Sequence, residues 1–166
     1  MSAWTKRIEI ATNVAILCAF VLVAALAAKR LWEPALLRNS NGPPIGANVS
    51  LPGVDWSRSN QSLVLALNTG CHFCSESADF YRRLVSSADS KGTRVLAVLP
   101  QPISESRAYL EKLGVTITEV VQSPLSAADV SGTPTVLLID QNGRIRKAWV
   151  GKLGLEQEQQ VIAGLR

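Results

Sequence analysis

Two cysteines, Cys71 and Cys74, stand where a strand pattern gives way to a helical pattern. Residues 62–68 form a continuous apolar run that is too short for a helix, which predicts a strand buried on both faces of a sheet. After the dithiol, apolar residues recur at three- and four-residue steps as far as Val85, which predicts an amphipathic helix. The pattern therefore predicts two thiols that open a helix at the carboxyl end of a central strand.

The rest of the chain continues this alternation of strands and helices. A strand at 94–99 and a helix at 104–113 form a crossover, which implies parallel strands. A strand at 135–140, an Asn-Gly turn and a strand at 145–150 predict an antiparallel hairpin. Less regular patterns indicate one or two short strands at 49–56, a strand or extended link at 115–121 and at most a single helical turn at 126–130. A last helix is marked by Leu155, Val161, Ile162 and Leu165.

The net charge of +4 resides mostly at the N-terminus. The first 38 residues carry five Lys and Arg against two Glu, which leaves 12 cations and 11 anions for the remainder of the 17 and 13. The folded part shows neither a basic patch nor interleaved aromatic residues, so we expect no nucleic-acid partner.

Residues 10–28 are almost all apolar. At about 1.5 Å of rise per residue, such a helix approaches the roughly 30 Å hydrocarbon core of a bilayer. We predict an uncleaved transmembrane anchor at 8–28, in preference to a cleaved signal, followed by a linker at 29–48 and a folded domain at 49–166. Cys18, inside the apolar run, is interpreted as a small hydrophobe.

The flanking cations do not decide the orientation of this anchor. The folded domain is placed on the periplasmic, extracytoplasmic side of the cell membrane, because N-terminal anchors behave like uncleaved signals and tethered thiol chemistry has targets there.

The dithiol indicates redox chemistry. At the start of a helix, Cys71 meets unpaired backbone amides that favour an attacking thiolate, while Cys74 lies one turn later and toward the core, as suits a resolving thiol. A static disulfide and a structural zinc site are less favoured alternatives. A closed zinc site needs four ligands, and besides the two thiols the chain offers only His72.

Two other positions bear on the dithiol. His72 is either a solvent-exposed residue without a role or an imidazole that stabilises the Cys71 thiolate. Pro134, which opens a strand, is either an ordinary trans proline or a cis proline that exposes the Thr133 backbone to pair with an extended substrate chain.

An apolar strand, Cys-x-x-Cys at a helix start and Gly132-Thr133-Pro134-Thr135 before a hairpin resemble the thioredoxin superfamily. With the added strand and helix and the N-terminal anchor, residues 43–166 are most similar to membrane-tethered TlpA/ResA-like thiol-disulfide oxidoreductases. The resemblance implies a three-layer α/β fold with a mixed sheet, Cys71 as nucleophile, Cys74 as resolving thiol and Pro134 as cis proline. It also implies protein thiols and disulfides as partners, an electron donor of the membrane or periplasm, and no cofactor or metal.

The chain departs from this family at several positions. Gly70 and Phe73 stand where Trp and Pro are common, so the direction of electron flow stays open. Leu65 replaces the buried acid of thioredoxins, and Ser77 replaces a Glu of some tethered relatives. Proton transfer to Cys74 therefore lacks an obvious base, with Glu76 as a weak candidate.

Two alternative functions stay open. A peroxiredoxin-like peroxidase would need a hydroxyl three residues before its cysteine, where this chain has Asn68. A tethered copper-binding chaperone could use Cys71, Cys74 and His72 as soft ligands.

Overall fold

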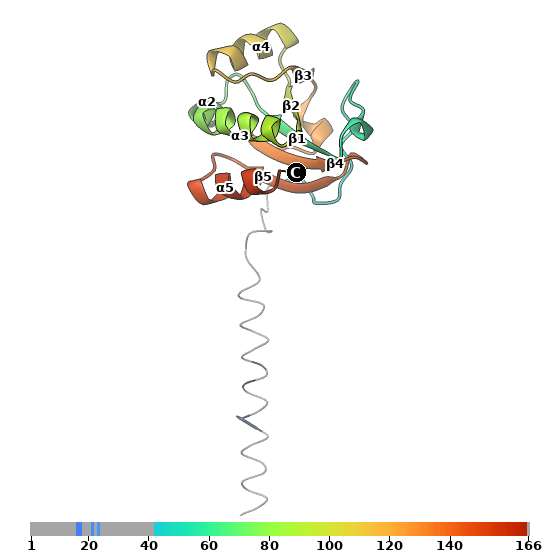
Figure 1. The fold of residues 1–166 in the computed structure, drawn as a ribbon, viewed down its shortest axis with the longest axis vertical. Coiled ribbons are helices and arrows are strands. Elements are labelled where there is room, and N and C mark those ends of the chain that lie inside the picture. Colours follow the sequence, from blue (N-terminus) through green and yellow to red (C-terminus); the bar gives the residue numbers. More distant parts are fainter. Residues whose placement is uncertain (1–15, 18–20, 22, 24–41, 166) are drawn as a thin grey trace, which may run out of the picture. The chain divides into compact units, whose positions relative to one another are not determined.

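The computed structural model describes residues 16, 17, 21, 23 and 42–165. The predicted anchor at 8–28, apart from those four residues, and the predicted linker up to residue 41 lie outside the described residues. No helix within the described residues is long and apolar enough to cross a membrane. The chain divides into two compact units, 1–38 and 39–166, and the labelled elements of Figure 1 belong to the second.

A five-stranded mixed sheet forms the centre of this unit, in the order β3-β2-β1-β4-β5 (Figure 1). β1 pairs in parallel with β2 and β2 with β3, whereas β4 is antiparallel to both β1 and β5. The predicted parallel crossover and the predicted hairpin are thus confirmed. The strands are β1 (Gln61–Ala66), β2 (Arg94–Leu99), β3 (Glu119–Gln122), β4 (Thr135–Asp140) and β5 (Ile145–Val150).

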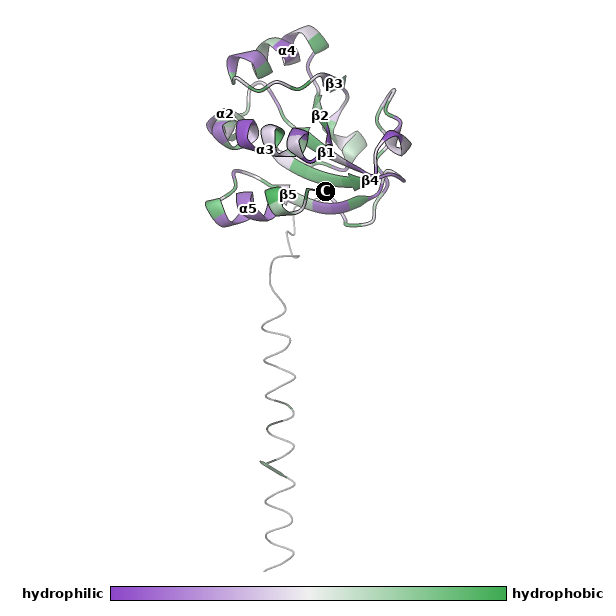
Figure 2. Cartoon of the chain, in the orientation of Figure 1, coloured by the Kyte–Doolittle hydropathy of each residue, from purple (hydrophilic) through white to green (hydrophobic). Residues whose placement is uncertain are grey.

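The helices gather on one face of the sheet, which Figure 1 shows and Figure 2 colours by hydropathy. They are α2 (His72–Glu76), α3 (Ala78–Ser90), α4 (Ile103–Lys112) and α5 (Leu155–Ala163). Their buried residues pack with one side of the strands in a core that includes Leu65, Cys74 and Tyr81. Alternation along β1 sends Val64 and Ala66 into a second core on the opposite face.

The layer over that second face is not built from a long helix. It consists of the N-terminal segment around Val49 and Leu51 and the short 3-10 helix η3 (Leu125–Ala128) with Val130. The single helical turn predicted at 126–130 is confirmed, and three layers are present, although irregular chain replaces helix in the third.

Two details of the sequence prediction were wrong. Residues 49–56 form no strand: the chain makes one isolated bridge, Asn48 to Arg144, turns at 52–53 and enters the 3-10 helix η2 (Trp56–Arg58). The helix after the dithiol is broken at Ser77, whose Oγ donates to the Phe73 carbonyl at 2.8 Å. The predicted last helix is confirmed as α5, which begins at Leu155, 76% exposed, and enters the core through Val161.

The turn between β4 and β5 receives the N-terminal segment. Gly143 has a φ of 76°, and its carbonyl accepts from the Val49 amide at 2.8 Å. A Cβ on Gly143 would lie 2.7 Å from Trp56 Cδ1, and the Trp56 indole donates to the Val49 carbonyl at 2.9 Å. Glycine is therefore required both by the backbone conformation and by the close approach of the indole ring.

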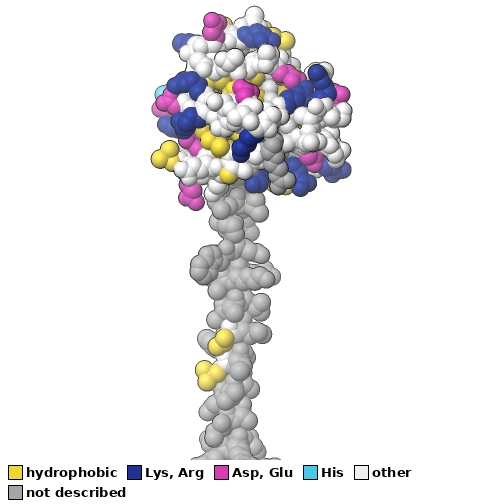
Figure 3. All heavy atoms as spheres, in the orientation of Figure 1, with side chains coloured by type: hydrophobic (Ala, Val, Ile, Leu, Met, Phe, Trp, Pro, Cys, Tyr) yellow, Lys and Arg dark blue, Asp and Glu magenta, His cyan; other side chains and the backbone are white. Residues whose placement is uncertain are grey.

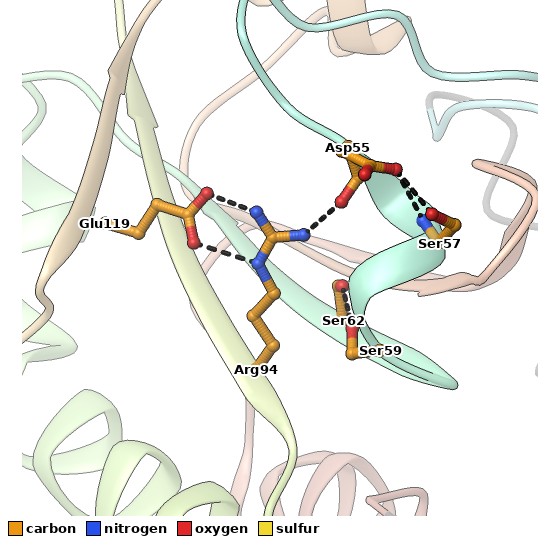
Figure 4. A network of polar contacts seen from close by, with 6 residues as sticks. All are labelled: Asp55, Ser57, Ser59, Ser62, Arg94 and Glu119. Atoms are coloured by element: carbon orange, nitrogen blue, oxygen red, sulfur yellow. Dashed lines mark hydrogen bonds and ion pairs between the residues drawn. The ribbon is translucent and has the colours of Figure 1, made fainter.

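At the same end of the sheet, Arg94 joins three segments (Figure 4). Its guanidinium forms a bidentate pair with the Glu119 carboxylate and donates to the Asp55 carbonyl at 2.6 Å. The Asp55 carboxylate in turn accepts from Ser57, whose backbone amide lies at 3.0 Å and whose hydroxyl lies at 2.7 Å. On the face shown in Figure 3, cationic and anionic side chains are interspersed over the domain.

Candidate active site

The strand register brings the dithiol and the Gly132-Thr133-Pro134-Thr135 segment together. Because β1 and β4 are antiparallel, Ala66 at the end of β1 faces Thr135 at the start of β4. The loop that continues from β1 therefore runs beside the loop that leads into β4. Cys71 Sγ lies 3.3 Å from the carbonyl oxygen of Thr133, 62 residues away in the sequence.

Cys71 is half-buried and forms the N-cap of α2. Its Sγ accepts a hydrogen bond from the Cys74 amide at 3.2 Å and donates to the Thr133 carbonyl. Its own amide donates to the Asn68 carbonyl at 3.0 Å. Both thiols are free, so the structure holds the reduced dithiol with one sulfur at the surface and the other behind it.

Cys74 is fully buried, with no exposed surface. Burial raises the pKa of the Cys74 thiol to about 12, and the neighbouring Cys71 sulfur adds to this shift. The Asn68 backbone and Thr133 act in the opposite direction. Cys74 is therefore a protonated thiol at neutral pH and needs help to become a thiolate.

The peptide bond between Thr133 and Pro134 is cis, as predicted. The Pro134 carbonyl accepts from the Gly151 amide at 2.7 Å, and the Gly132 carbonyl accepts from the Thr135 hydroxyl at 2.7 Å. These bonds attach the segment to β4 and to the end of β5. Pairing of the Thr133 backbone with a substrate chain stays a prediction.

His72 and Glu76 lie on the outer side of α2. The His72 side chain is 78% exposed, and its Nε2 is 3.2 Å from Glu76 Oε1. The other Glu76 oxygen binds Lys152 Nζ at 3.0 Å, which is the main reason that the pKa of Glu76 is lowered. The Glu76 carboxylate thus binds the His72 imidazole and the Lys152 ammonium group at the surface instead of serving as a base for Cys74.

Sequence reasoning missed how Asn68 shapes the loop. Its Oδ1 accepts from the Gly70 amide at 2.9 Å and from Gln101 Nε2 at 3.2 Å. Asn after a strand and before Thr-Gly is a common turn signal, which could have revealed this role. Asn68 stands where the peroxidase alternative needs a hydroxyl, and its side chain instead binds the backbone of the loop.

Sequence reasoning also missed two tyrosines near the dithiol. The Tyr109 hydroxyl is 3.2 Å from Ser75 Oγ, whereas the Tyr81 hydroxyl is buried. Across the described residues, no three His, Cys, Asp or Glu side chains come together as ligands for a metal ion. In the copper-chaperone alternative, His72 would have to leave Glu76 to join the two thiols.

The sequence matches no protein-family model. It is 26% identical over 102 residues to the thiol-disulfide oxidoreductase ResA of Geobacillus thermodenitrificans (strain NG80-2), a match that spans 59% of each chain. The chain thus matches less than two thirds of the length of this relative.

Solved structures share the fold. A Chlorobium tepidum protein assigned as the thiol:disulfide interchange protein DsbE aligns with a TM-score of 0.56 and 23% identity, over 74% of this chain and 99% of that one. StoA from Bacillus subtilis aligns with a TM-score of 0.51 and 14% identity, over 71% and 94%. The chain therefore has the thioredoxin-like α/β fold of these solved structures and is similar in sequence to ResA.

Proposed function

We propose that the chain is a thiol-disulfide oxidoreductase that exchanges disulfides with protein partners through Cys71 and Cys74. One observation carries the proposal: the half-buried Cys71 sulfur lies between the Cys74 amide and the Thr133 carbonyl, with the buried Cys74 one turn behind it. Similarity to ResA, which is named for this activity, supports it.

The exchange has two steps. The Cys71 thiolate attacks a partner disulfide, which forms a mixed disulfide and releases one partner sulfur as a thiolate. Cys74 then loses its proton and attacks Cys71 Sγ, which forms the Cys71–Cys74 disulfide and releases the second partner thiolate. The partner gains two electrons and the dithiol loses two, and the reverse sequence oxidises a partner.

The proposal includes a location and an electron donor. The predicted anchor at 8–28 would tether the domain to the extracytoplasmic side of the cell membrane, where a membrane or periplasmic donor would regenerate the dithiol. The apolar run supports this, as do Ile16, Leu17, Val21 and Val23, which are helical with exposed side chains. Membrane fractionation tests the tether, and labelling of Cys71 in intact cells by a membrane-impermeant maleimide tests the side.

The mechanism is tested with Cys74→Ser, which should trap mixed disulfides. On non-reducing gels, Cys74→Ser should show covalent adducts with partner proteins that disappear after reduction, while Cys71→Ser in the same background shows none. If Cys74→Ser captures nothing although the wild-type protein turns over, the roles given to the two cysteines are wrong.

A further inference from the structure

Asn68 holds the turn that precedes the nucleophile. Its side-chain Oδ1 accepts from the Gly70 amide at 2.9 Å, and its carbonyl accepts from the Cys71 amide at 3.0 Å. Asn68 therefore binds the last two backbone amides before α2, as Asn commonly does at the first position of a turn. Cys71 in turn is the N-cap of α2, and its Sγ accepts from the Cys74 amide at 3.2 Å. The place of the reactive sulfur thus depends on the turn at 68–71.

Gly70 is the residue of this turn with the least restraint of its own. Its φ lies outside the left-handed region, and a Cβ on it would meet Asn68 Oδ1 at 3.5 Å, which is an ordinary contact. The turn therefore does not require glycine at this position. Because glycine has access to more backbone conformations than any other residue, the bond from its amide to Asn68 restrains the residue next to Cys71.

Gln101, which follows β2, orients the Asn68 side chain. Gln101 Nε2 donates to Asn68 Oδ1 at 3.2 Å, so this oxygen accepts two hydrogen bonds. Gln101 is itself held by α4, because the Oγ of the fully buried Ser106 donates to the Gln101 carbonyl at 3.2 Å. On the same helix, Glu105 accepts from the Thr69 hydroxyl at 2.9 Å. The beginning of α4 is thus joined to the turn at two neighbouring positions.

We propose that Asn68 and Gln101 are positioning residues for disulfide exchange, which fix the turn at 68–71 and thereby hold the Cys71 sulfur on the Cys74 amide. The inference rests on the proposed function, in which Cys71 is the nucleophile. The Cys74 N–H stabilises a thiolate at Cys71, since a hydrogen bond to a charged acceptor is stronger than one to a neutral acceptor. The side chains of Asn68 and Gln101 act through the turn and transfer no proton.

The pH dependence of Cys71 alkylation by iodoacetamide tests the proposal. It is measured on the full-length chain in a Cys18→Ser, Cys74→Ser background, in which Cys71 is the only thiol and the amide of residue 74 is retained. Asn68→Ala should move the rate profile upward by about one pH unit, as expected when a thiolate loses a hydrogen bond. Gln101→Met should move it by about half a unit, since Asn68 keeps its bond to the Gly70 amide.

A shifted profile separates positioning from a merely structural role. The charged side chains of the surrounding elements are the same in both variants: His72 and Glu76 on α2, Glu105 on α4 and Lys152 after β5. The shift therefore reports the hydrogen bond to Cys71 Sγ. Gln101→Met also removes Gln101 Oε1, which is buried and unpaired, so the resistance of the protein to urea should not fall.

A rescue variant and a matched control complete the experiment. Gly70→Ala added to Asn68→Ala restricts the turn by another route and should reverse at least half of the shift. Gln122→Met replaces an exposed glutamine at the end of β3 and should leave the profile unchanged.

Profiles of Asn68→Ala and Gln101→Met that coincide with the parent would overturn the positioning role, as would an equal shift in Gln122→Met. Absence of any recovery in the double variant would overturn the part given to the turn. Failure of the wild-type chain to reduce insulin disulfides would instead overturn the proposed function, because alkylation of Cys71 does not require exchange.

Discussion

The two ends of the sheet differ in whether their polar groups have hydrogen-bond partners. At the amino end of β1 and β2, the Arg94 guanidinium binds Glu119 and the Asp55 carbonyl (Figure 4). At the carboxyl end, where the dithiol lies, the described structure leaves Tyr81 Oη and Gln101 Oε1 buried and unpaired. Unpaired buried groups reduce stability, so polar pairs stabilise the amino end of the sheet more than the carboxyl end.

The difference between the two ends of the sheet predicts that activity and stability can be lowered separately by substitution. Cys71→Ser should reduce insulin-disulfide reduction to the background rate, because no other described thiol reaches the surface of the dithiol loop. The free energy of unfolding of the reduced protein should change by less than about 0.5 kcal/mol. Chemical denaturation beside the activity assay checks both, and residual turnover would contradict the role of Cys71 as nucleophile.

At the opposite end, Gly143→Ala should lower the free energy of unfolding by about 2–3 kcal/mol and leave the exchange rate of the folded protein unchanged. The loss combines a positive φ with displacement of Trp56 from its bond to Val49.

Gly92→Ala is the matched control for Gly143→Ala. Gly92 has a similar φ of 67° but nothing within 4 Å of an added Cβ, so only the backbone contribution of about 1 kcal/mol should appear. Equal losses in the two variants would show that the Trp56 contact adds nothing.

Arg94→Met should lower the free energy of unfolding by about 1–2 kcal/mol, since it leaves Glu119 and the Asp55 carbonyl without their shared partner. Methionine retains the apolar part of the side chain. Arg58→Met removes an exposed cation near the same end and should change stability by less than about 0.5 kcal/mol. Similar losses of stability in both variants would mean that Arg94 stabilises the protein only through its charge.

The sheet was predictable from the sequence because its strands carry their own signals. The apolar runs of β1 and β4 and the Asn-Gly turn at Gly143 each specify local structure. The N-terminal segment was not predictable from the sequence, since residues 49–56 are placed by long-range bonds to Gly143 and by the turn at 52–53. An apolar segment that covers a sheet without joining it looks, in sequence, like a strand.

The candidate site also has features that the sequence predicted and one that it did not. Cys71 and Cys74 follow from a local motif, and the cis peptide before Pro134 follows from the resemblance to the thioredoxin superfamily. Their meeting follows from the antiparallel pairing of β1 and β4. Tyr81 gave no signal of its own, because at helical spacing from Cys74 it looks like any core aromatic residue. Only its unpaired hydroxyl distinguishes it.

That hydroxyl gives a prediction in which stability increases. Tyr81→Phe removes an unpaired buried polar atom and keeps the ring, so the reduced protein should become more stable by about 1 kcal/mol. Tyr109→Phe, which breaks a bond to Ser75, should not gain stability. A loss of stability in Tyr81→Phe, measured by urea denaturation, would mean that the hydroxyl has a partner in the resting state.

The smallest effect is expected at His72, on the outer surface of the dithiol end. His72→Ala should lower the reduction potential, because the Glu76 carboxylate loses its contact with the His72 imidazole and keeps only the one with Lys152. A surface contact of this kind contributes little, so the shift in a glutathione titration should be on the order of 10 mV. Glu76→Gln in the same titration should raise the potential, since it removes the negative charge itself. An unchanged value in both variants would remove this surface pair from the redox chemistry and leave the surroundings of the buried Cys74 as the part that sets the reduction potential.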